Sequence, residues 1–135
     1  MTLYHVSSAK FKKFKAAPLT FFFDDIEESM AMLTDQQWKG SAYMYKIEIS
    51  DITESNLLYV GDDEVNYDLI ANPSYQDCKE GLIGKCITST KKKGYVGLIV
   101  RDYSAIDPQN DMYSIALFPQ VLQDIEPKII KSIKF

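Results

Sequence analysis

Short segments with the composition of β-strands recur along this chain and constrain its fold more than any other feature. Residues 42–50 show the pattern most clearly, because apolar and polar side chains alternate there with the period of two of a half-buried strand. Because most of these segments lack βαβ spacing, the sequence predicts an α+β fold with antiparallel sheets. The other predicted strands cover residues 2–6, 20–23, 56–60, 96–102, 112–118 and 128–134.

Helical segments are predicted between some of the strands. Asp24 is placed to cap a helix, and Glu27 three residues later completes a capping-box-like pattern. Gly40 can stop this helix, which is expected to end before Trp38. Further helices are predicted over 63–70 and 75–92, and a turn or short helix over 119–124. The apolar face of the first helix carries Ile26, Met30 and Leu33.

Aromatic side chains are numerous, with nine Tyr and seven Phe among 135 residues. Such side chains supply core volume, and they also build pockets for planar ligands. Residues 9–19 are predicted to form a polar loop from which Phe11 and Phe14 point inward, with Pro18 closing it. The length and a hydrophobic fraction of 46% fit a single domain over residues 1–135 with one core.

The charge balance is acidic, with a net charge of −4. A protein that binds the phosphate backbone without sequence preference is usually basic, so general nucleic-acid binding is disfavoured. Two clusters run against the acidic average, and each is either ordinary solvated surface or a patch for an anionic cofactor or partner. The clusters are Lys10, Lys12, Lys13 and Lys15, and Lys91, Lys92 and Lys93.

The cysteines and the hydropathy pattern indicate the cellular compartment in which the protein is expected. Cys78 and Cys86 are too few and too widely spaced for a zinc site or a redox motif, so no metal is expected. The N-terminal residues lack the features of a signal peptide. No stretch approaches the ~20 apolar residues that span a bilayer. A cytoplasmic protein with reduced thiols and no membrane partner is therefore expected.

Several landmarks follow one another in a recognisable order. Residues 3–7 read Leu-Tyr-His-Val-Ser, residues 22–23 are an aromatic pair just before a predicted helix, and residues 94–98 read Gly-Tyr-Val-Gly-Leu. A late strand over 114–118, a proline and a final hydrophobic strand complete the series. In this order they resemble the ADP-ribosyltransferase superfamily, especially its small phage and bacterial members. The resemblance spans nearly the whole chain and implies a split β-sandwich of two small antiparallel sheets, nearly perpendicular, around an NAD cleft.

The resemblance implies mono-ADP-ribosyl transfer from NAD to a host or bacterial protein in the cytoplasm. Breaking the nicotinamide–ribose bond gives the ribose carbon oxocarbenium character, so the site must hold the dinucleotide and place negative charge near that carbon. Val96 stands where relatives often have Asp, and an expected Tyr and Glu are missing. A binding module that keeps the fold without catalysis, gripping a host protein or a nucleotide-like ligand, is therefore the alternative. A third possibility is an unrelated α+β domain with similar short motifs.

The first two landmarks supply most of the site that the resemblance implies. His5 would bond a ribose hydroxyl or the adenosine side of NAD, the backbone of Val6 would hold the nicotinamide amide, and Ser7 would add a hydroxyl. Phe22 stands where relatives have a tyrosine that stacks on nicotinamide, and a phenylalanine keeps the π-face that attracts a cationic ring. The competing interpretation of His5 is an ordinary strand residue whose ring is satisfied by one hydrogen bond. At least one of the three consecutive phenylalanines over 21–23 must pack in the core, because a strand alternates faces.

The late carboxylate matches the family pattern least. Relatives carry Glu at the place of Tyr113, two residues after Asp111. Asp111 is the candidate that would stabilise the developing cation, with Asp107 and Gln109 behind it in the same loop. A solvated loop aspartate is the competing interpretation.

Two further positions complete the predicted cofactor contacts. Leu33 stands where many relatives place a second stacking tyrosine. Arg101 either reaches a phosphate of NAD or forms a surface ion pair. The whole predicted set for NAD is His5, Val6, Ser7, Phe22, Phe23, Leu33, Arg101 and Tyr113.

Overall fold

The computed structural model describes the chain apart from residues 16–18, 36–37, 61–90, 104–105 and 107–110. Several sequence predictions therefore lie outside the described residues. They are the helix over 63–70, nearly all of the helix over 75–92, both cysteines, Pro18, Asp107 and Gln109.

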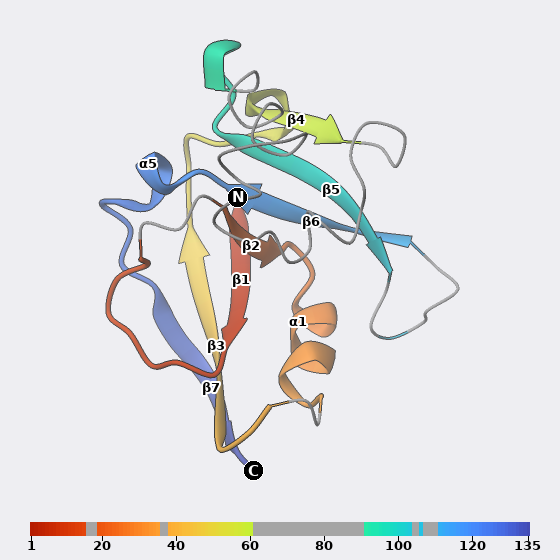
Figure 1. The fold of residues 1–135 in the computed structure, drawn as a ribbon, viewed down its shortest axis with the longest axis vertical. Coiled ribbons are helices and arrows are strands. Elements are labelled where there is room, and N and C mark those ends of the chain that lie inside the picture. The colour runs from red at the N-terminus through yellow and green to blue at the C-terminus, as the bar shows by residue number, and fades with distance from the viewer. Residues whose placement is uncertain (16–18, 36–37, 61–90, 104–105, 107–110) are drawn as a thin grey trace.

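The described residues form seven strands, two short α-helices and one turn of 3₁₀ helix, Glu54–Asn56 (Figure 1). The helices are α1 (Ile26–Leu33) and α5 (Pro119–Leu122). The strands are β1 (Thr2–Ser7), β2 (Thr20–Phe23), β3 (Ser41–Glu48), β4 (Leu57–Val60), β5 (Gly97–Tyr103), β6 (Asp111–Leu117) and β7 (Lys128–Lys134). Every strand predicted from the sequence is present, which confirms the α+β class.

The strands pair into one sheet in the order β4-β5-β6-β2-β1-β3-β7. β1 and β2 are joined at the register pair Tyr4–Phe23, here called the β1–β2 joint. On either side of this joint the two halves of the sheet run crosswise (Figure 1). β4 lies parallel to β5, and the other neighbouring strands are antiparallel. The prediction of two separate antiparallel sheets is therefore corrected to one mixed sheet, because the short joint keeps its crossing halves hydrogen-bonded.

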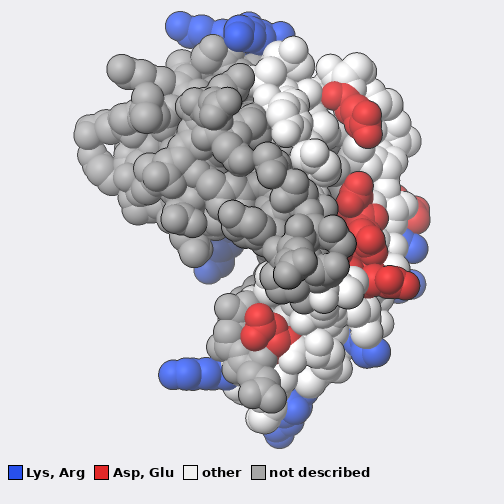
Figure 2. Space-filling view, turned by 90° about the vertical axis from the view of Figure 1, so that its right-hand side faces the viewer, with Lys and Arg blue, Asp and Glu red and all other residues white. Residues whose placement is uncertain are grey.

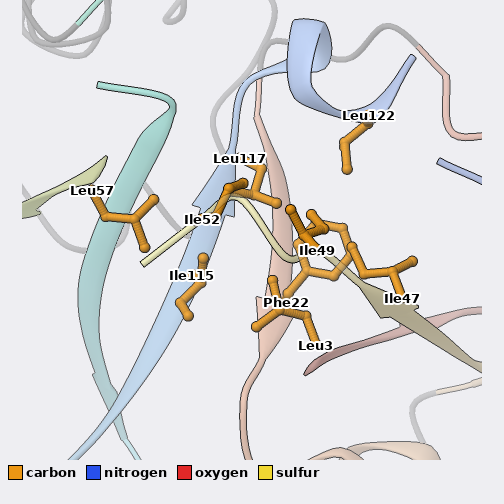
Figure 3. Packing of buried hydrophobic residues seen from close by; sticks show 9 residues of the cluster. All are labelled: Leu3, Phe22, Ile47, Ile49, Ile52, Leu57, Ile115, Leu117 and Leu122. Carbon is orange, nitrogen blue, oxygen red and sulfur yellow. The ribbon is translucent and has the colours of Figure 1, made fainter. Parts of the chain in front are cut away.

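The main core lies on one face of this sheet (Figure 3). Residues that pair across neighbouring strands point to the same face. The pairs Leu3–Ile47 and Phe22–Ile115 therefore bring buried side chains from both halves of the sheet together. Leu122 of α5 closes the cluster from above. Apolar burial of this kind, at roughly 25 cal/mol per Å², is what holds the two halves in one domain.

α1 packs on the opposite face, over β1 and β3. Leu33 is fully buried there with Ala42 and Met44 of β3. Half-buried side chains surround this second cluster. They are Tyr4, Val6, Met30, Trp38 and Ile133.

α1 ends before Trp38 as predicted, but its N-cap and the role of Gly40 differ from the prediction. The N-cap is Asp25 and not Asp24, because the Asp25 carboxylate accepts a hydrogen bond of 2.8 Å from the Glu27 backbone N–H. The helix ends at Leu33, where the Thr34 hydroxyl donates to the Met30 carbonyl at 3.1 Å. Gly40 does not stop the helix but immediately precedes β3, with a φ of 83° that few other residues adopt.

Replacing Ser29 by alanine is expected to stabilise the protein. Ser29 is fully buried in α1, and its hydroxyl has no hydrogen-bond partner among the described residues. Removing an unsatisfied buried hydroxyl recovers its desolvation cost, and alanine is the better helix former, so a gain of about 1 kcal/mol is expected. Urea unfolding of Ser29→Ala beside the wild type measures the difference. A loss of stability would mean that the hydroxyl has a partner after all.

Candidate functional site

His5 lies on β1 beside the β1–β2 joint and faces the main core. Its ring Nδ1 is 2.7 Å from the Phe21 carbonyl oxygen, and because a carbonyl only accepts, Nδ1 carries the proton and donates. The ring is half-buried. One hydrogen bond therefore satisfies His5 within the sheet. This agrees with the alternative interpretation of His5 as an ordinary strand residue.

Four aromatic rings surround the His5 ring. Phe14 and Phe22 lie 5.5 Å from it, and Phe11 and Tyr45 lie 6.2 and 6.4 Å away, all between ring centroids. Phe11 and Phe14 come from the loop after β1, which confirms the prediction that they point inward. These five rings, here called the aromatic cluster, pack the imidazole among aromatic side chains.

The Tyr45 hydroxyl holds this loop in place. It donates to the Ala9 carbonyl at 2.9 Å and accepts from the Phe11 backbone N–H at 2.8 Å. The Phe11 ring then stacks on Tyr45 with centroids 4.2 Å apart and planes 14° apart. Since Tyr45 is fully buried, the loop is tied to the centre of β3 and forms a fixed cover.

The surroundings of His5 lower the pKa of its imidazole. Burial disfavours the charged ring, and the hydrogen bond to Phe21 opposes this effect only in part. His5 is therefore neutral near pH 7, so in this structure it can donate or accept a hydrogen bond but supplies no positive charge.

The lowered pKa predicts a loss of stability in mild acid. The unfolded imidazole titrates near its ordinary value of 6.5 and the folded one lower, so the unfolded state binds more protons as pH falls through 6.5. The stability is present above this pH and declines below it. Because His5 is the only histidine, the urea midpoint of His5→Phe should change less than that of the wild type between about pH 7.5 and 5.5. If the urea midpoint changed equally with pH in both proteins, the pH dependence would come from groups other than His5.

Phe22 and Leu33 do not offer surfaces to a ligand in this structure. Phe22 is 1% exposed and Leu33 is 0% exposed. They also lie on opposite faces of the sheet, Phe22 in the main core and Leu33 beneath α1. The geometry thus favours core packing for both and does not bring the two predicted stacking positions together.

A pair of half-buried aromatic side chains lies on the α1 side of the joint. Phe23 of β2 and Tyr4 of β1 are direct register partners, and Val6 lies two residues beyond Tyr4 on the same face. Tyr4 and Val6 both pack against the cluster that contains Leu33. Two predicted cofactor residues, Val6 and Phe23, are therefore brought together with Tyr4. The sequence pattern missed Tyr4, although strand alternation already placed it opposite His5.

Asp24 carries an unusual carboxyl group next to Phe23. Asp24 lies at the surface, yet partial desolvation raises the pKa of its carboxyl group. A hydrogen bond from its own backbone lowers this pKa, and the negative charges of Asp25 and Glu54 raise it. Figure 2 shows Asp and Glu side chains gathered along one edge of the described surface. Phe23 is followed directly in the chain by two of the acidic residues, Asp24 and Asp25.

Ser7 is engaged locally at the end of β1. Its hydroxyl accepts a hydrogen bond of 3.1 Å from the Ala9 backbone N–H. This bond starts the loop that covers His5. The predicted contact of Ser7 with a ligand would have to share or replace this bond.

The remaining predicted residues lie on β5 and β6. Arg101 is the register partner of Tyr113, and Asp111 that of Tyr103, so for Arg101 and Asp111 the structure describes backbone positions. Tyr113 is 45% exposed and its ring lies 5.9 Å from that of Tyr59. Asp111 is four residues along β6 from the partner of Phe22, roughly 14 Å from Phe22 in a regular sheet. The structure therefore does not place Asp111 beside Phe22.

Comparison with known proteins gives no match, either among protein-family models or among curated sequences. In the part of the chain that the structure describes, no group of three or more His, Cys, Asp or Glu side chains is arranged to hold a metal ion. None of the helices in that part has the length and apolar character needed to cross a bilayer.

Proposed function

We propose that this chain is an NAD-dependent mono-ADP-ribosyltransferase that acts on a host or bacterial protein. The proposal depends on one observation, the geometry of the β1–β2 joint. Two crossing halves of one sheet meet there, where the resemblance implies two nearly perpendicular sheets around an NAD cleft, and the half-buried pair Tyr4–Phe23 lies at the meeting point. A planar cation such as the nicotinamide of NAD is attracted to an aromatic face.

The nicotinamide end of NAD would lie on the α1 side of this joint. Phe23 takes the stacking role first predicted for Phe22, because Phe23 is half-buried whereas Phe22 is buried. The backbone of Val6 would hold the nicotinamide amide. Asp24 follows Phe23 in the chain, and its carboxylate would supply the negative charge that stabilises an oxocarbenium-like ribose carbon. Asp111 stays the predicted carboxylate on β6, and His5 supports the joint from its other face.

A binding module without catalysis is the second candidate function. The burial of Phe22 and Leu33 favours it, because both positions where relatives place stacking tyrosines are closed. In this reading the same fold grips a host protein or a nucleotide-like ligand without breaking the nicotinamide bond.

Incubation with labelled NAD and bacterial lysate tests the proposal. The wild type is expected to transfer label to protein, and Phe23→Ala to lose about tenfold or more of this activity, since an aromatic–cation contact of 1–2 kcal/mol is removed. Phe135→Ala is the matched control, because Phe135 is an exposed aromatic residue on the strand end after β7. Its activity should equal that of the wild type.

Calorimetry separates the two candidate functions. NAD or ADP-ribose binding without transfer or NAD hydrolysis would replace the first candidate by the second. No transfer, no hydrolysis and no binding of either ligand would remove NAD from the function of this chain. Loss of activity in Asp24→Asn, with Asp124→Asn unchanged, would support a role for the carboxylate beside Phe23.

A further inference from the structure

A groove separates the loop after β1 from the start of β7, at the outer end of the aromatic cluster. It has a volume of about 700 Å³, which is within the range of ligand clefts. Phe11, Pro127 and Ile129 give it an apolar floor. Its charged lining residues are Lys10, Lys12, Lys13, Lys128 and Glu126.

The groove carries an excess of positive charge, because four lysines and one glutamate line it. None of its four lysines forms an ion pair within the described part of the chain. Lys128 is also the direct cross-strand partner of Lys46, whose ammonium group lies 3.5 Å from the Glu48 carboxylate. In a protein with a net charge of −4, this local concentration of lysines favours an anionic partner.

β7 supplies a second recognition element next to the groove. It is the last strand in the sheet order, so one of its backbone edges has no neighbouring strand among the described residues. An extended segment of another chain can pair with such an edge through main-chain hydrogen bonds. Ile130 of β7 is 39% exposed and adds apolar surface.

The lysines of β7 determine which kind of chain can pair with its outer edge. A second copy of this chain would bring its own β7 lysines toward Lys128, Lys131 and Lys134, and edge lysines oppose such pairing. An acidic segment gains from the same charges. We propose that the basic groove and the outer edge of β7 bind an extended acidic segment of a partner protein, which adds to the sheet as a further strand. This proposal is independent of NAD.

Fluorescence anisotropy with a labelled peptide tests this surface. The probe is a seven-residue peptide of alternating glutamate and valine, which matches the seven residues of β7. A lysine–valine peptide should bind at least about tenfold more weakly, because its charge is reversed. A glutamate–proline peptide should also bind at least about tenfold more weakly, because proline has no N–H to donate. Equal binding of either comparison peptide would overturn the proposal, as would tighter binding of a seven-nucleotide thymidine strand.

A matched pair of charge reversals locates the binding. The double variant Lys12→Glu/Lys128→Glu should weaken binding of the acidic peptide at least about tenfold. The double variant Lys92→Glu/Lys93→Glu makes the same charge change away from the groove and should alter peptide binding little. Equal weakening by both pairs would show that overall charge alone attracts the peptide. In the wild type, bound peptide should also slow hydrogen exchange of β7 amides. Unchanged exchange at saturation would rule out strand addition.

Discussion

Gly97→Ala is expected to lower the free energy of unfolding by about 3 kcal/mol or more. A Cβ added at Gly97 would lie 2.2 Å from the Ala116 carbonyl oxygen and 3.1 Å from the Leu117 Cα. Both contacts are with the backbone of β6, which cannot turn away as a side chain would. Overpacking of this kind typically costs 1–3 kcal/mol when a core can adjust, and here the strand pairing itself must move. Urea unfolding, read as a shift in the midpoint, measures the loss.

Gly94→Ala is the matched control for this prediction. Gly94 has a φ of 86° and nothing within 4 Å of an added Cβ, so alanine there has only the cost of a left-handed backbone, about 1–2 kcal/mol. The two variants make the same chemical change three residues apart. If Gly97→Ala proved no more destabilising than Gly94→Ala, the close approach of β5 to β6 at this point would be disproved.

Phe22→Ala is expected to destabilise the protein by about 3–5 kcal/mol. Its ring is buried in the main core, pairs across the sheet with Ile115, and lies against His5 and Phe14. Truncation removes the transfer free energy of the ring and leaves a cavity where the two halves of the sheet meet. Thermal or urea unfolding gives the change directly.

Phe23→Ala provides the contrast, because the neighbouring ring is only half-buried on the opposite face. Its expected cost is about 1 kcal/mol, a fraction of the value for a fully buried aromatic residue. The pair thus separates the core residue from the residue proposed to contact nicotinamide. A larger stability loss in Phe23→Ala than in Phe22→Ala would reverse the assignment of the two rings and with it the proposed position of NAD.

Much of the local structure was predictable because it depends on short-range chemistry. The alternation over 42–50 predicted β3, and the polar loop was correctly expected to turn Phe11 and Phe14 inward. The N-cap was misplaced by one residue, since Asp24 and Asp25 are equally good caps in sequence and only the chain path decides which carboxylate meets the Glu27 N–H. The residues expected to contact NAD were chosen by resemblance. The structure brings His5 and Phe22 within 5.5 Å of each other on the core side, and Val6 and Phe23 together on the α1 side.

The sequence alone determined where strands form and that Phe11 and Phe14 turn inward, because period-two alternation and turn residues act within a few positions. The tertiary structure decided which of three consecutive phenylalanines is core, since that depends on the face of β2 that meets β6. It also decided that β1 and β2 join two crossing halves of one sheet and that Gly97 must lack a side chain. These features arise from backbones distant in sequence that approach each other, and a local pattern carries no information about such contacts.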